Sequence, residues 1–330
     1  MLGIAVLGAG RIGKIHANNV AANPRVKLVA VADPVAQAAG PLARSLDAEP
    51  MQDPVAAIER PDVDAVVIGT PTDTHAALLL KAVGLGKAVF CEKPIALDME
   101  QTEAVVAEVE RLKGRVMMAF NRRFETTFAE MRKAIDVGEI GDVRQVVITS
   151  RDPGLPPPAY IETSGGIFRD MTIHDFDIAR WLLGEEPVEV SATGSRLVDP
   201  GVERFDDFDT VMVQMRTASG KQCHINNCRE AVYGYDQRIE VFGSKGMLLQ
   251  DNLRRTTIRR WSGTATDARE PLLNFFLERY QQAYRSELDA FVDALVDDEP
   301  FPTSVHDGLR ALRLAECALE AATSGRTVKV

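Results

Sequence analysis

The feature that most constrains the fold is a glycine-rich turn near the N-terminus. Residues 2–7 form an apolar, strand-like run, and Gly8-Ala9-Gly10-Arg11-Ile12-Gly13 follows it directly. Apolar side chains then recur at helical spacing up to Val20. A strand, a glycine turn and a helix in this order open a βαβ unit, in which the glycines allow a tight turn, close approach of a pyrophosphate and close helix packing. The pattern therefore predicts a doubly wound parallel sheet at the start of the chain.

An acidic residue after the second predicted strand indicates which dinucleotide binds. Residues 28–32 form this strand, and Asp33 follows it at the spacing of about 20 residues from Gly13 that dinucleotide-binding domains show. A carboxylate there accepts hydrogen bonds from the ribose hydroxyls and repels a 2′-phosphate. We therefore expect NAD as the cofactor, with NADP as a minor alternative because Arg11 could pair with that phosphate.

The first 122 residues alternate strands with helices, as a Rossmann domain does. Further strands are expected at residues 64–70, 88–91 and 115–120, and helices are expected to be capped by Asp73 or Thr74 and to begin from Asp98. Ligands bind at the carboxyl ends of the strands in such sheets, so these ends should form one rim around the cofactor. His75 lies on this rim and is expected to begin a helix rather than to take part in chemistry. The expected cofactor-binding residues are Gly8, Gly10, Arg11, Ile12, Gly13, Asp33, Thr70, Pro71, His75, Glu92 and Lys93.

Residues 123–330 are expected to form a second domain, of the α+β class, for substrate binding and oligomerisation. A strand is expected at 143–150, and alternating runs at 210–216, 221–229 and 237–242 indicate antiparallel strands. The expected fold class is thus α/β plus α+β, an N-terminal Rossmann sheet joined to an open-faced, mostly antiparallel C-terminal sheet. Long helical patterns at residues 273–296 and 303–322 end the chain.

The open face of the second sheet favours a homo-oligomer. Met212 and Phe242 fall on the face that the domain's own helices should leave uncovered. An apolar face exposed to water in a monomer would be covered by association with further copies of the chain.

The segment 170–177, with the sequence DMTIHDFD, is the main candidate for chemistry. Asp170 and His174 are four residues apart, so on a helix they share one face, with Cβ atoms roughly 5–6 Å apart. Together with Lys93, they offer a carboxylate, an imidazole and an amine that could deprotonate a hydroxyl. In the alternative interpretation Asp170 caps the helix, His174 packs on it and Lys93 is a solvated residue at a strand end.

Charge and cysteine usage argue against other classes of function. The net charge of −10 disfavours a nucleic-acid partner, which normally needs a basic patch. The four cysteines lack CxxC spacing, and Cys223 and His224 would alternate to opposite faces of a strand, so we expect no metal site. No apolar run approaches 18 residues and the chain opens on a strand, so we expect no membrane span or signal peptide, and a cytoplasmic location.

The combination of the glycine turn with Asp33, the triplet Glu92-Lys93-Pro94 and the pair Asp170-xxx-His174 resembles the glucose-fructose oxidoreductase and inositol dehydrogenase (Gfo/Idh/MocA) family over the full length. The stretches 121–124, 164–177 and 233–238 are most similar to its inositol 2-dehydrogenases. The resemblance implies a catalytic triad, substrate contacts, a homotetramer and a cis Lys93-Pro94 peptide. The implied catalytic residues are Lys93, Asp170 and His174, and the implied substrate-binding residues are Arg123, Asp152 and Tyr235.

The resulting hypothesis is NAD-dependent oxidation of a secondary ring hydroxyl of a cyclic polyol, with myo-inositol to its 2-keto product (scyllo-inosose) as the leading case. An imidazole ordinarily titrates closest to neutral pH, so His174 is the expected base, with Asp170 orienting it and Lys93 favouring the alkoxide. Lys93 as the base is the rival assignment. Alternative substrates are another inositol isomer or an aldose, and a non-catalytic sensor of NAD and sugar is the alternative of another class.

Overall fold

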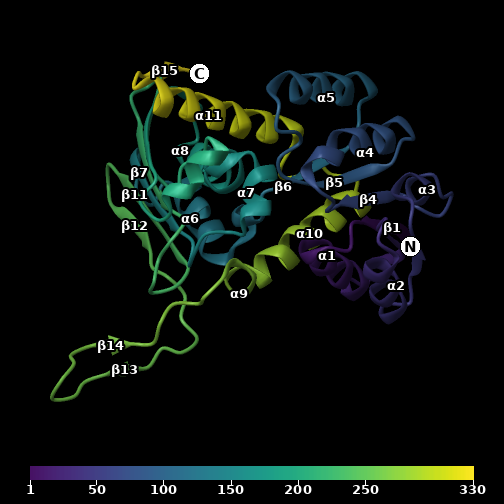
Figure 1. Cartoon of the computed structure of the whole chain (residues 1–330), viewed down its shortest axis with the longest axis horizontal. Helices are drawn as coiled ribbons and strands as arrows, with labels where there is room; N and C mark the ends of the chain where they lie inside the picture. Colours follow the sequence, from purple (N-terminus) through teal and green to yellow (C-terminus); the bar gives the residue numbers. More distant parts are fainter. The chain divides into compact units, whose positions relative to one another are not determined.

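The computed structural model describes all 330 residues, which form two compact units. The first unit consists of residues 1–124 and 283–312, and the second consists of residues 125–282 and 313–330 (Figure 1). The segment 283–312 therefore packs with the N-terminal residues, whereas the division into 1–122 and 123–330 treats the domains as consecutive stretches. That division remains a prediction about functional domains.

The first unit contains the predicted parallel sheet, with six strands in the order β3-β2-β1-β4-β5-β6. All neighbouring strands run parallel, and the central ones are almost entirely buried, as expected for strands covered on both faces. This arrangement confirms the Rossmann prediction. The strands are β1 Leu2–Leu7, β2 Val26–Ala32, β3 Glu49–Met51, β4 Ala65–Ile68, β5 Ala88–Glu92 and β6 Val116–Ala119.

Helices follow the strands of this sheet, and one start differs from the sequence prediction. Asp98 caps its helix as expected, because its side chain accepts from the Gln101 N–H. The preceding helix begins at Thr72 instead, with Pro71 as the N-cap residue, so Asp73 and Thr74 lie inside its first turn and do not cap it. The helices in chain order are α1 Arg11–Ala22, α2 Ala36–Ser45, α3 Pro54–Ile58, α4 Thr72–Gly84 and α5 Met99–Leu112, followed by the 3-10 turn η1 Asn121–Phe124.

A helix from late in the chain completes the core of the first unit. Helix α10, Gln281–Val296, places Phe291 edge-on against Phe90 of β5, with ring centroids 5.5 Å apart. Leu288 and Val292 join the same buried cluster. Large aromatic and aliphatic side chains contribute most to such a core. The helix predicted at 273–296 is therefore real, but its regular part begins at Gln281, after the short helix α9, Phe276–Arg279.

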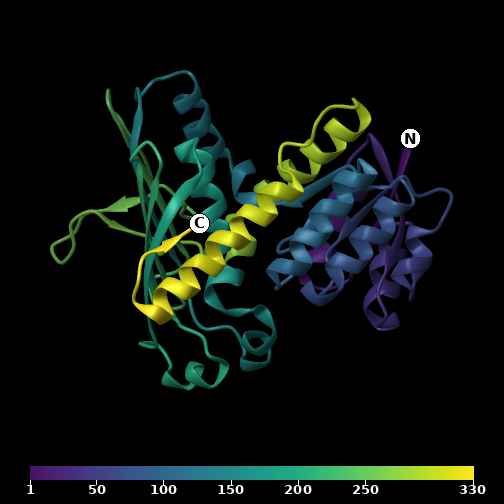
Figure 2. The ribbon, with the colours of Figure 1, turned by 90° about the horizontal axis from the view of Figure 1, so that it is seen from above.

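The second unit contains a sheet of seven strands in the order β12-β11-β7-β10-β9-β8-β15. Only β7 and β10 pair in parallel, which confirms a mostly antiparallel sheet. Its helices lie on one side of this sheet (Figure 2). The strands are β7 Val143–Arg151, β8 Pro187–Ser195, β9 Thr210–Thr217, β10 Gln222–Cys228, β11 Asp236–Gly243, β12 Met247–Gln250 and β15 Val328–Lys329; the helices are α6 Thr126–Asp136, α7 Pro158–Ser164, α8 Ile173–Leu183 and the end of α11 Val305–Ser324; the 3-10 turn η3 is Pro200–Phe205.

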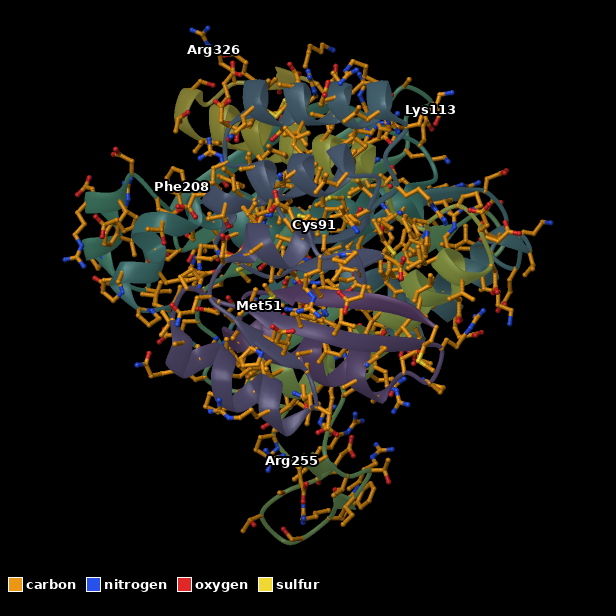
Figure 3. All side chains as sticks on the ribbon, turned by 90° about the vertical axis from the view of Figure 1, so that its right-hand side faces the viewer. Met51, Cys91, Lys113, Phe208, Arg255 and Arg326 are labelled. Carbon is orange, nitrogen blue, oxygen red and sulfur yellow. The ribbon has the colours of Figure 1, made fainter.

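The other side of this sheet is open, as predicted. In β9, Val211, Val213 and Met215 are buried, whereas Met212 between them is exposed, and Phe242 of β11 is exposed as well. A hairpin arm, formed by β13 Arg259–Arg260 and β14 Ala268–Arg269, stands away from the sheet and carries Arg255 (Figure 3). None of the helices combines the length and hydrophobicity that crossing a bilayer requires.

Candidate active site

The glycine turn has the geometry of a phosphate-binding loop. Gly8 has φ +96°, and a Cβ added to it would lie 2.5 Å from the Gly69 carbonyl oxygen. A Cβ on Gly13 would lie 2.0 Å from the Gly8 carbonyl oxygen, whereas one on Gly10 would meet no atom within 4 Å. The turn is therefore closed where the helix packs and open at Gly10. The N-cap of α1 is Gly10 and no side chain caps it, so the first N–H groups of the helix are available for an anion.

Asp33 lies beside this turn, as the sequence predicted. Its Oδ2 accepts from the Ala9 N–H at 2.7 Å, and its Oδ1 accepts from the Val35 N–H at 2.8 Å. The carboxylate is thus held at the end of β2 by two backbone donors, next to the open part of the turn. These residues fit a dinucleotide whose pyrophosphate lies at the start of α1 and whose adenosine ribose reaches the carboxylate.

The remaining rim residues of the first unit come together after β4 and β5. His75 is buried, with Nδ1 2.8 Å from the Pro94 carbonyl oxygen and Nε2 2.9 Å from the Thr70 carbonyl oxygen. Lys93 follows Glu92, the last residue of β5, and the Lys93-Pro94 peptide is cis, as the resemblance implied. His75 lies within α4, but its ring connects two strand ends, which the sequence did not predict.

In the second unit the segment 170–177 is helical, as predicted, but its first part is not an α-helix. Residues Phe168–Thr172 form the π-helical turn η2, and α8 continues from Ile173. π-helical turns occur frequently at functional sites. The buried residues Thr172, Asn227 and Asp175 anchor this junction to β10 through hydrogen bonds of 2.7 and 2.8 Å.

Burial separates the polar residues of this segment into two groups. Asp175 and Asp177 are buried, whereas Asp170 and His174 are half-buried. The carboxylate and imidazole that could reach a ligand are therefore the two that the spacing selected. The alternative interpretation has Asp170 as a helix cap, but neither η2 nor α8 has a side-chain cap at its N-terminus.

Two partners of Asp170 were missed by the sequence reasoning. The Tyr160 hydroxyl donates to its Oδ1 at 2.8 Å, and both terminal nitrogens of Arg229 lie 3.4 Å from its Oδ2. Arg229 is 1% exposed and also faces Asp207 at 3.9 Å. Tyr160 as a whole is 49% exposed, but partial desolvation, and then the negative charge of Asp170, raise the pKa of its hydroxyl above the usual range, so it acts as a donor. A tyrosine and an arginine thus orient the carboxylate.

The predicted substrate-binding residues are divided between the units. Asp152 follows β7, and its backbone N–H donates to the Cys228 carbonyl oxygen at 3.0 Å. Tyr235 is mostly buried, edge-on to Tyr280 with ring centroids 5.9 Å apart. Arg123 lies in the first unit, where it donates to Asp307 at 2.8 Å. Of the predicted catalytic and substrate-binding residues, the first unit contains Lys93 and Arg123, and the second contains Asp152, Asp170, His174 and Tyr235.

Comparison with known protein families accounts for both sheets. Residues 2–120 match the oxidoreductase family with an NAD-binding Rossmann fold, and residues 128–249 match the GFO/IDH/MocA C-terminal domain. The chain belongs to the GFO/IDH/MocA family. Its N-terminal part is an NAD-binding Rossmann domain, so the expected cofactor is confirmed.

Within the GFO/IDH/MocA family, the chain is similar over its full length to several inositol dehydrogenases. The chain is 50% identical to the inositol 2-dehydrogenase of Rhizobium meliloti over 98% of both chains, and 42% identical to the myo-inositol 2-dehydrogenase of Thermotoga maritima over 99% of this chain and 98% of that one. A myo-inositol dehydrogenase structure from Corynebacterium glutamicum has a TM-score of 0.97 at 46% identity, with 100% of this chain and 99% of that one covered. The chain is therefore an NAD-dependent oxidoreductase similar to inositol dehydrogenases.

Proposed function

We propose that this chain oxidises a secondary ring hydroxyl of a cyclic polyol with NAD, and that its substrate is myo-inositol, which becomes 2-keto-myo-inositol (scyllo-inosose). The observation that carries this proposal is the half-buried pair Asp170 and His174 in an otherwise buried segment. The relatives named inositol 2-dehydrogenase and myo-inositol 2-dehydrogenase support the choice of substrate.

In the proposed mechanism, His174 accepts the proton of the reacting hydroxyl. Asp170 orients this imidazole and is itself oriented by Tyr160 and Arg229. The Lys93 amine hydrogen-bonds to the same hydroxyl oxygen and stabilises the negative charge that develops on it, a contribution of typically a few kcal/mol. Bound NAD supplies the hydride acceptor. Asp152, Arg123 and Tyr235 are proposed to bind the other hydroxyls of the ring.

A panel of substrates tests this function. Steady-state rates are measured for inositol isomers and for aldoses, each with NAD and with NADP. The expected result is the highest kcat/KM for myo-inositol with NAD. A higher value for another isomer or for an aldose would replace the substrate, and the absence of turnover with every inositol would refute the proposal.

Variants test the assigned residues. His174→Ala and Lys93→Ala are each expected to lower kcat by about 100-fold or more, because general-base and electrostatic contributions are of this size. His306→Ala is the control, since this exposed histidine pairs only with Glu110 on the surface. If Lys93 were the base, the acid limb of the pH profile would vanish in Lys93→Ala and persist in His174→Ala. Unchanged kcat in both variants would refute these assignments, whereas a wild type that binds NAD and a polyol without any turnover would indicate a sensor.

We also propose that the open face of the second sheet joins copies of the chain, as a homotetramer by family resemblance. Met212, Phe242, Met247 and Leu249 are exposed on β9, β11 and β12 of this sheet. Light scattering at micromolar concentration is expected to show an oligomer that Phe242→Glu dissociates. Val137→Glu, at an exposed apolar residue after α6, is the control. A monomeric wild type would refute this proposal.

A further inference from the structure

Lys93 lies between two residues that buried histidines hold in place. His16 Nε2 is 2.8 Å from Oε1 of Glu92, the residue before Lys93. His75 Nδ1 is 2.8 Å from the carbonyl oxygen of Pro94, the residue after it. The two histidines are 0% and 1% exposed, and all of these residues belong to the first unit. The sequence assigned no role to His16, and it placed His75 at the start of a helix and among the residues of the cofactor rim.

The environment of His16 fixes both its position and its tautomer. The ring is edge-on to Phe90 at 5.0 Å and to Tyr284 at 6.0 Å, so it has little freedom to move. Its Nδ1 is buried and has no hydrogen-bond partner. A proton on Nδ1 would leave a buried donor unsatisfied, which costs more than a bare acceptor nitrogen. The neutral ring therefore donates its only N–H, at Nε2, to the Glu92 carboxylate.

His75 connects the same turn to the end of the neighbouring strand. A carbonyl oxygen can only accept, so the contacts with Pro94 and Thr70 are both hydrogen bonds when the ring carries two protons, and a neutral ring satisfies one of them. With a proton on Nδ1, in the charged ring or in that neutral tautomer, the ring donates to Pro94 and ties the backbone after β5 to α4, the helix that follows Thr70.

We propose that His16 and His75 are positioning residues that aim the Lys93 amine, one from each side of Lys93 in the chain. His16 lies on α1, the helix that begins at the glycine turn, and His75 lies on α4, the helix that follows Thr70. The two rings therefore set the amine relative to the backbone that receives the cofactor. A misplacement of 1 Å can cost on the order of 100-fold in rate, so this support matters to catalysis. The inference rests on the proposed role of Lys93.

Variants at the two histidines separate this role from a general structural one. His16→Leu and His75→Leu remove the hydrogen bonds at similar volume, and His16→Gln keeps a donor near the position of Nε2. The control is His306→Leu, the same change at an exposed histidine of the first unit. His16→Leu leaves the Glu92 carboxylate without its hydrogen-bond donor, and this loss could prevent folding. Glu92→Ala therefore serves as a second variant, which breaks the same hydrogen bond at its more exposed partner.

The first measurement needs no substrate. Hydrogen–deuterium exchange of residues 92–96 is expected to be faster in His16→Leu and His75→Leu than in the wild type, and unchanged in His306→Leu. This readout decides the inference even if the wild type turns over no polyol, an outcome that would refute only the proposed function. Wild-type exchange rates in both leucine variants, and in Glu92→Ala, would overturn the inference.

The second measurement uses whichever polyol the wild type oxidises. Both leucine variants are expected to lose about 10- to 100-fold in kcat. In His16→Leu the Kd for NAD should change much less than kcat, and His16→Gln is expected to recover most of the loss. In a Lys93→Ala background His16→Leu should cause no further loss, because a residue that acts through Lys93 is not additive with its removal. A loss of the same size in that background would overturn the inference.

Discussion

Replacing Arg229 with methionine tests how the second unit holds Asp170. The arginine is 1% exposed, and its terminal nitrogens lie 3.4 Å from Asp170 and 3.9 Å from Asp207. Methionine keeps much of the volume of the side chain and removes its charge. Asp170 and Asp207 then both lose the guanidinium that they share.

The expected loss of stability depends on the hydrogen bonds that Asp170 and Asp207 keep in the variant. Removing one partner of a buried ion pair costs about 3–5 kcal/mol. Asp170 keeps its bond from Tyr160 and is 15% exposed at its side chain, and Asp207 keeps bonds of 2.8 Å from two backbone N–H groups. We therefore take the low end and expect Arg229→Met to lower the free energy of unfolding by about 3 kcal/mol at pH 8.

The loss should depend on pH with a definite sign. Burial raises the pKa of Asp207 and Arg229 opposes this rise, so the variant raises that pKa further. A carboxyl group with a raised folded-state pKa contributes its stability at low pH and loses it as the pH rises through that value. At pH 5 Asp207 in the variant takes up a proton more readily than at pH 8. The loss caused by Arg229→Met should therefore be smaller at pH 5.

Tryptophan fluorescence during urea unfolding measures the free energy of unfolding of the structural unit that contains Arg229. The chain has two tryptophans, Trp181 and Trp261, and both lie in the second unit. The double variant Arg229→Met, Asp207→Asn is expected to recover about half of the loss at pH 8, because the amide oxygen still accepts from the backbone without burying a charge. Equal losses at pH 5 and pH 8, together with no recovery in the double variant, would refute this reasoning.

Three further outcomes follow from the structure. Gly13→Ala should abolish NAD binding, measured by titration calorimetry, because its Cβ would lie 2.0 Å from the Gly8 carbonyl oxygen; binding within threefold of wild type would contradict this. Cys91 should stay unlabelled by iodoacetamide in the native protein at pH 8, as detected by mass spectrometry, because burial raises the pKa of its thiol. The Arg259 guanidinium holds the pKa of Asp267 at about 2, so its carboxyl should titrate by NMR near that value, and Arg259→Ala should raise it; a midpoint near 4 in both proteins would show that the pair does not form.

The cofactor-binding half of the fold could be predicted because its signals are local. The glycines at positions 8 and 13 are required by backbone geometry within one turn, and Asp33 follows at a spacing set by one helix and one strand. The packing of α10 in the first unit carries no such signal. Its amphipathic pattern shows that Phe291 must be buried, but the pattern does not specify that the partner is Phe90, from a strand early in the chain.

In the candidate site, too, the sequence indicated the residues proposed to react but not the residues that position them. Asp170 and His174 could be proposed because acid–base chemistry uses few side-chain types, and residues four apart in a helical segment lie on one face. The residues that hold them, or hold Lys93, need only be donors or cations of the right reach, and many sequences satisfy that condition. Arg229 ends the strand-like run predicted at 221–229, and that pattern does not show that tertiary packing around Asp170 turns it into a buried cation. His16 likewise depends on a glutamate 76 residues away, so its role follows from the folded sheet and helix rather than from any motif.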